Sequence, residues 1–134
     1  NSRLDTIQAT LLNIKLKSLN KLNNKRRQIA NFYKKNINNE KINIINYSKF
    51  AVYHQYVILV EKRNNLIKHL EKNSIQFGIH YPLSINQLKC FKNIFSNKKF
   101  TNAEYISSHC LSLPIDPYLT KRDQKKICLV LNNF

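Results

Sequence analysis

Residues 1–17 read NSRLDTIQATLLNIKLK, and they open a stretch in which leucine and isoleucine recur every three or four residues. That spacing places the apolar side chains on one face of a helix. Neither proline nor glycine interrupts the stretch before residues 36–41, where asparagine favours turns over helix. The pattern predicts one long helix over residues 4–33, with an apolar stripe that comprises Leu4, Ile7, Leu11, Leu12, Leu19 and Leu22.

After residue 41 the chain changes to short segments rich in isoleucine, valine and tyrosine, which are typical of strands. We expect strands over residues 42–45, 53–60 and 75–80. Apolar residues at helical spacing predict further helices over residues 64–72 and 85–95.

Two segments near the end have the spacing of a capping box, in which a hydroxyl and a carboxylate bond reciprocally to backbone N–H groups. They are Thr101 with Glu104 and Thr120 with Asp123, and the helices that they begin should end near residues 110 and 132. Prolines between them keep the connecting segment extended.

The elements together predict a single domain over residues 1–134, of mixed α/β (α+β) class. Its expected architecture is a long N-terminal helix and a small, mostly antiparallel sheet of about three strands flanked by helices.

The charge of the chain is strongly positive, with 23 lysines and arginines against 7 acidic residues. A basic surface with exposed tyrosine and phenylalanine would suit a non-catalytic nucleic-acid-binding domain, and this alternative stays open. The lysines, however, are spread over every part of the chain, and asparagine, lysine and isoleucine dominate throughout. Such a distribution favours a solvated surface over one binding face, so we expect no nucleic-acid partner.

Several other classes are excluded by what the sequence lacks. The 3 cysteines form no Cys-x-x-Cys pair, which argues against a disulfide framework or a metal site and favours the reducing cytoplasm. The apolar run at residues 56–60 is too short to span a membrane. Gly78 is the single glycine of the sequence, so the sequence contains no Gly-rich phosphate-binding loop.

Three stretches together resemble one enzyme family. They are residues 1–17, FGIHYPL at residues 77–83 and LSLPIDPYLT at residues 111–120. In this order and at about this spacing, they are similar to the C-terminal portion of the DegT/StrS-type sugar aminotransferases. The resemblance covers essentially the whole chain but only the last third or so of such an enzyme. Because the chain begins at Asn1 and has no methionine, we expect a fragment of a longer protein.

The resemblance implies a C-terminal small domain of a fold-type-I enzyme that uses pyridoxal phosphate (PLP). Such enzymes transfer an amino group, usually from glutamate, to a nucleotide-linked keto sugar. They work as homodimers, commonly in surface-polysaccharide synthesis. A related PLP-dependent sugar dehydratase differs at the Schiff-base lysine, which the family carries upstream of this segment. The resemblance therefore implies no catalytic residue here, a cofactor bound mainly by the missing domain, and an inactive fragment when alone.

The resemblance also assigns roles to individual residues. His80 is similar to the family histidine that approaches the cofactor and the sugar, and Tyr81 is its companion at the substrate. Asn1 resembles the asparagine that reaches the PLP phosphate of the partner subunit, while Arg3 would add a charged contact to that anion or to the sugar diphosphate. An isolated small domain would also leave Leu4, Ile7 and Leu11 exposed or in contact with another chain. An eroded remnant with only a structural role is a further alternative.

Overall fold

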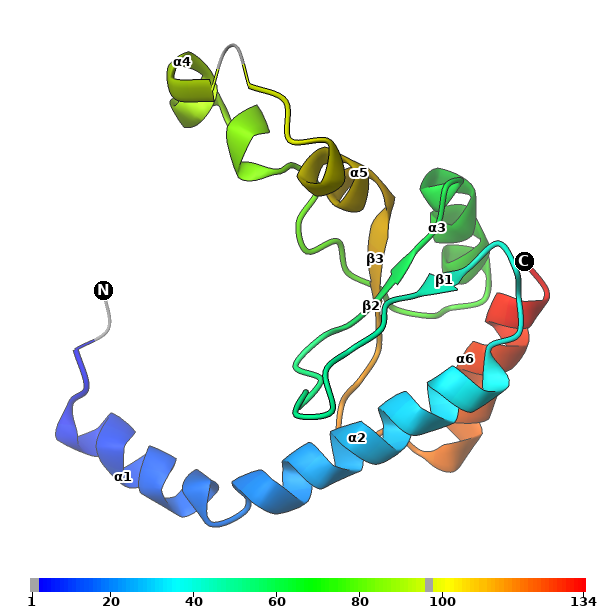
Figure 1. The fold of residues 1–134 in the computed structure, drawn as a ribbon. Coiled ribbons are helices and arrows are strands. Elements are labelled where there is room, and N and C mark those ends of the chain that lie inside the picture. The colour runs from blue at the N-terminus through cyan, green and yellow to red at the C-terminus, as the bar shows by residue number, and fades with distance from the viewer. Residues whose placement is uncertain (1–2, 96–97) are drawn as a thin grey trace.

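The computed structural model describes residues 3–95 and 98–134 (Figure 1). The helices are α1 (Thr6–Leu16), α2 (Leu19–Asn36), α3 (Arg63–Lys72), α4 (Lys92–Phe95), α5 (Thr101–His109) and α6 (Lys121–Asn132). The strands are β1 (Asn43–Ile44), β2 (Tyr56–Leu59) and β3 (Cys110–Leu113). Two short 3₁₀ helices, η1 (Ile85–Gln87) and η2 (Lys89–Phe91), precede α4.

The three strands form one antiparallel sheet in the order β1-β2-β3. The second half of α2 lies beside α6, and these helices cover one side of the sheet (Figure 1). The predicted α/β class, with a small antiparallel sheet flanked by helices, is therefore confirmed.

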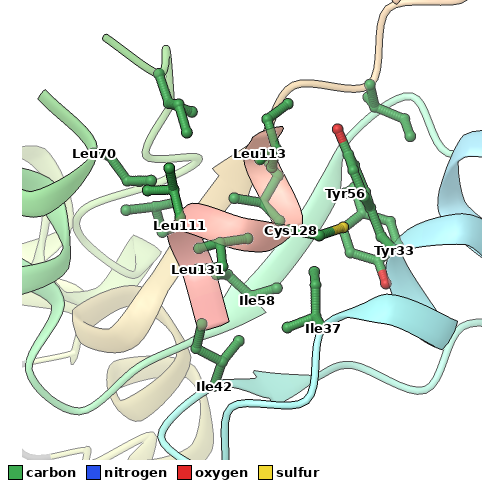
Figure 2. Close-up of a cluster of buried hydrophobic side chains, with 14 of the residues drawn as sticks. Tyr33, Ile37, Ile42, Tyr56, Ile58, Leu70, Leu111, Leu113, Cys128 and Leu131 are labelled. Atoms are coloured by element: carbon green, nitrogen blue, oxygen red, sulfur yellow. The ribbon is translucent and has the colours of Figure 1, made fainter. Parts of the chain in front are cut away.

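The core fills the space between these helices and the sheet (Figure 2). Ile58, Leu111 and Leu131, from β2, β3 and α6, have no exposed surface. Tyr33 of α2 is equally buried, and its hydroxyl donates to the Pro114 carbonyl oxygen at 2.8 Å. The buried phenol is thus paired, as a polar group in an apolar interior must be.

The predicted long helix is in fact two helices, α1 and α2, separated at residues 17–18. Ser18 donates its N–H to the Lys15 carbonyl oxygen at 3.0 Å, a three-residue step that tightens the turn and ends α1. Serine is a weak helix former because its side chain competes for backbone groups. Since α1 buries none of its residues, no packing keeps the two helices in line.

The apolar stripe of α1 is exposed, as the sequence predicted. Leu4, just before α1, and Ile7 and Leu11 within it have 68%, 75% and 54% of their surface accessible. Figure 1 shows α1 projecting away from the sheet.

The third strand is not the segment that the sequence indicated. Residues 75–80 make only one bridge, Gly78 to Ser112, whereas Cys110–Leu113 pairs along its length with β2. The reason lies at the start of the segment, where the Ile75 N–H caps α3 by donating to the Leu70 carbonyl oxygen at 2.9 Å. The backbone of Ile75 therefore serves the end of α3, and only Gly78 of this segment pairs with β3.

The helix predicted over residues 85–95 is also wrong, because η1, η2 and α4 replace it. Ser84 and Gln87 form a capping box at η1, but Leu88 then adopts an extended conformation that stops the helix. These short elements contact one another and project from the sheet beside α5 (Figure 1).

One of the two predicted capping boxes is confirmed. At α6, Asp123 N–H donates to Thr120 Oγ1 at 3.1 Å and Thr120 N–H donates to the Asp123 carboxylate at 3.3 Å. At α5 the cap is Phe100, one residue earlier than predicted, and its N–H donates to Glu104 at 3.2 Å.

Candidate functional site

The site begins with the pairing of Gly78 and Ser112. Gly78 N–H donates to the Ser112 carbonyl oxygen at 3.1 Å, and Ser112 N–H donates to the Gly78 carbonyl oxygen at 2.7 Å. The pair fixes the backbone of the segment that carries His80 against the outer edge of β3.

The His80 ring folds back over Gly78. A Cβ atom at position 78 would lie 2.4 Å from Cε1 of His80, which is closer than real side-chain carbons approach. This close contact explains why the residue is glycine. Nδ1 of His80 lies 3.0 Å from the hydroxyl oxygen of Ser112, which is only 6% exposed.

Tyr81 lies next to His80 at the surface. The two rings are 5.8 Å apart and nearly perpendicular, and 71% of the surface of Tyr81 is accessible. The Tyr81 carbonyl oxygen accepts from the buried Cys110 thiol at 3.6 Å, so the backbone is anchored while the ring is exposed. The structure thus places His80 and Tyr81 side by side at the surface, and the roles predicted for them stay predictions.

Arg3 is exposed and precedes α1, in the part of the molecule that projects from the sheet (Figure 1). No hydrogen bond within the described residues joins it to His80 or Tyr81. Asn1 lies outside the described residues. The α1 N-terminus is capped by Asp5, whose carboxylate accepts from Gln8 N–H at 2.8 Å. The roles predicted for Asn1 and Arg3 therefore stay predictions.

Sequence reasoning missed the polar network at the base of the projecting segment. Asn86 donates to the Glu104 carboxylate at 2.7 Å, and the same oxygen accepts from Phe100 N–H. The network ties η1 to the start of α5. The contact of Ser112 with His80 was missed as well. Residues 111–114 were noted as part of a motif, but nothing in that motif indicates a contact with His80.

A cavity of about 570 Å³ lies elsewhere. Its lining comprises Glu40, Lys41, Asn43, Leu59, Val60, Glu61, Lys62, Asn65, Tyr105 and Phe134. It includes neither His80 nor Tyr81.

The groups whose pKa burial raises most lie in the core and not beside His80. Burial raises the pKa of Cys128 to about 11 from an ordinary 9.0. Burial, followed by neighbouring ionisable groups that include Cys128, also raises the pKa of Tyr33 and that of Tyr56. These groups stay neutral at physiological pH, so they supply no charge to a ligand.

Residues 3–95 and 98–134 contain neither a candidate metal cluster nor a helix that could span a membrane. Among the residues that the structure describes, no group of three or more histidine, cysteine, aspartate or glutamate side chains could hold a metal ion. Over the same residues, every helix falls short of the length and apolarity that crossing a bilayer requires.

Comparison with known proteins identifies what the chain is similar to. The model of the DegT/DnrJ/EryC1/StrS aminotransferase family matches residues 1–132. The chain is 33% identical to dTDP-3-amino-3,6-dideoxy-alpha-D-galactopyranose transaminase of Aneurinibacillus thermoaerophilus, over 100% of the chain and 37% of that protein. It is 28% identical to UDP-2-acetamido-2-deoxy-3-oxo-D-glucuronate aminotransferase of Pseudomonas aeruginosa, over 99% of the chain and 37% of that protein.

Solved structures agree in fold. The DegT DnrJ EryC1 StrS aminotransferase from Brucella abortus superposes with a TM-score of 0.90 at 32% identity, over 100% of this chain and 36% of that one. DesV of S. venezuelae superposes with a TM-score of 0.93 at 26% identity, over 99% of this chain and 37% of that one. The chain thus spans about a third of the length of the relatives that it matches. Nothing in these comparisons supports a nucleic-acid-binding role.

Proposed function

Because the chain belongs to the DegT/DnrJ/EryC1/StrS aminotransferase family, we propose that it is the C-terminal small domain of a sugar aminotransferase. The enzyme transfers an amino group, from glutamate, to a nucleotide-linked keto sugar. The observation that carries the proposal is the family match over residues 1–132. Relatives named for aminotransfer on dTDP- and UDP-linked sugars support the substrate class.

The cofactor implied by the family is PLP, which supplies the electron sink through which an amino group is taken up and passed on. His80 and Tyr81 are exposed, and neither lines the cavity of about 570 Å³. They therefore suit one wall of a pocket that residues outside this chain complete. Those other residues would make most of the contacts to the cofactor. In this proposal Nε2 of His80 binds an oxygen of the sugar or cofactor, and the Tyr81 ring shields it from water.

Asn1 and Arg3 serve a second subunit in the proposed homodimer. Asn1 donates to the PLP phosphate of the partner, and Arg3 contacts that anion or the sugar diphosphate. Both residues precede the N-terminus of α1, where unpaired N–H groups and the helix dipole favour an anion. Since Asp5 already places a carboxylate there, the positive charge of Arg3 would offset its repulsion of the phosphate.

The exposed stripe of α1 supports the domain assignment. A row of large apolar side chains that this domain leaves uncovered suits an interface with the rest of a larger protein or its partner. The unpaired cysteines suit the reducing cytoplasm as the place of action, with surface polysaccharide as the destination of the product.

The test uses the full-length protein loaded with PLP. We expect glutamate to shift the cofactor absorption, and a nucleotide-linked keto sugar then to gain an amino group, read as a mass change with release of 2-oxoglutarate. Loss of water from the sugar in place of amination would instead identify a sugar dehydratase. The 134-residue chain alone should give no turnover.

Two variants sharpen this test. His80→Ala and Arg3→Ala should lower kcat/KM in the full-length protein, while His54→Ala, an exposed histidine outside the site, serves as the matched control. An enzyme that neither reacts with glutamate nor converts any nucleotide-linked keto sugar would overturn the proposed function.

A further inference from the structure

Ser112 contacts the His80 segment through both its backbone and its side chain. It lies in the middle of β3 and is 6% exposed. Its backbone N–H and carbonyl both bond to Gly78, two residues before the histidine. Its hydroxyl is 3.0 Å from Nδ1 of His80. One buried residue therefore fixes both the backbone and the ring.

This contact determines which ring nitrogen is available. With Nδ1 facing the Ser112 hydroxyl, Nε2 is left without a hydrogen-bond partner among the described residues, on an exposed side chain. Gly78 leaves room for the ring, because a Cβ atom there would collide with Cε1 of His80. The imidazole is thus oriented by the serine hydroxyl and given its space by the glycine.

The chemistry of a hydroxyl sets what the oriented ring can do. A serine O–H can donate to an unprotonated Nδ1, and its oxygen can accept from a protonated Nδ1. Rotation of the hydroxyl therefore accommodates either tautomer without moving the ring. A carboxylate in this place would accept only, and would fix the proton on Nδ1.

We propose that Ser112 is a positioning residue for His80, which holds the ring in place while leaving Nε2 able either to donate or to accept a hydrogen bond. The inference rests on the proposed function only in assigning Nε2 to the sugar or cofactor. The orientation of the ring is independent of that assignment. It allows the same nitrogen to bind a keto oxygen as a donor and a hydroxyl as an acceptor.

The direct test is nitrogen NMR of the full-length protein labelled on its histidine imidazoles. Ser112→Ala should change the ring-nitrogen shifts and the tautomer ratio of His80, while Ser112→Thr, which keeps the hydroxyl, should restore them. Ser107→Ala is the matched control, because Ser107 is also a buried serine but its hydroxyl donates to the Glu104 carbonyl oxygen. In the active enzyme, Ser112→Ala should lower kcat/KM by about three- to tenfold, the effect of one neutral hydrogen bond.

A second variant covers a failure of Ser112→Ala to fold. Gly78→Ala should displace the His80 ring and give the same change in the nitrogen spectrum, because the colliding atom is the end of a side chain. Unchanged His80 shifts in the folded variants would overturn the positioning role, whatever the activity. Changed shifts in a protein with no aminotransferase activity would leave the positioning role standing and overturn the proposed function instead.

Discussion

Helices α1 and α2 are separated only by residues 17–18 and both carry leucine and isoleucine, yet they have opposite surroundings. α2 buries Ile29, Ala30 and Tyr33 against the core, whereas none of the residues of α1 is buried. α2 lies beside α6, while α1 projects into open space (Figure 1). Periodicity thus identifies the apolar face of a helix but says nothing about what covers it.

The difference also separates two kinds of apolar residue. Those of the core stabilise this domain by leaving water on folding. The apolar residues of α1 add nothing to the folding of this domain, because none of them is buried in it. They are therefore available to contact another surface. The predictions below would break this distinction or sharpen it.

The largest effect is expected in the core. Leu111→Ala should lower the free energy of unfolding by about 2–5 kcal/mol, because the side chain is fully buried and leaves a cavity. Leu11→Ala in α1 should change it by less than about 0.5 kcal/mol, because that side chain is 54% exposed. Urea denaturation measures both. Equal losses would mean that α1 packs on its own domain in solution.

The next effect is that of high pH. The pKa of Cys128 is raised to about 11 from 9.0, so between these values the folded state holds a proton that the unfolded state has lost. Stability is therefore fully present below pH 9 and falls as the pH rises towards 11, by roughly 2–3 kcal/mol from this group. Tyr33 and Tyr56 act in the same direction.

Urea titrations at several pH values check this sign. Cys128→Ala should flatten the decline, although it lowers stability at neutral pH by opening a cavity. Cys90→Ala, at an exposed cysteine, should leave the decline unchanged. A stability that rises above pH 9 would contradict the buried, neutral thiol.

Removing a helix cap should lower global stability only where the helix packs on the core. Thr120→Ala removes the cap of α6, which packs on the core, and should cost about 1 kcal/mol of global stability. Asp5→Ala removes the cap of α1 and should lower only local helicity, seen by hydrogen exchange at the first turn. A global loss from Asp5→Ala would show that α1 is part of the cooperative unit.

The smallest effect on folding is expected from polar substitution in α1. Ile7→Gln should leave the unfolding midpoint nearly unchanged, because 75% of that side chain is already in water. It should, however, reduce self-association of the chain, which light scattering at increasing concentration measures. Arg26→Gln in α2 is a control that removes charge without changing the apolar stripe.

The features that the sequence predicted well depend on residues close together in the chain. The α6 cap was found because Thr120 and Asp123 lie one turn apart, and α3 was found from its own periodicity. The third strand was missed because β3 follows α5 without an intervening turn and becomes a strand only by pairing with β2. The break at Ser18 was missed because a weak helix former ends a helix only where packing does not hold it.

In the candidate site, too, the sequence indicated residues within one motif but not contacts between distant segments. His80 and Tyr81 were singled out by their motif; both are exposed, and their roles stay predictions. Ser112 was not, because it lies 32 positions away and meets the histidine only once β3 has formed. The reason for Gly78 was equally hidden, since it depends on how one imidazole folds back.

The contact between α2 and α6 has a consequence for how the chain folds. Asn132 bonds to the backbone of residues 36 and 38, across separations of 96 and 94 positions. Closing so long a loop costs entropy before any contact repays it, which slows the search for the native topology. During synthesis, the interior of this domain would stay open to water and to chaperones until α6 had left the ribosome.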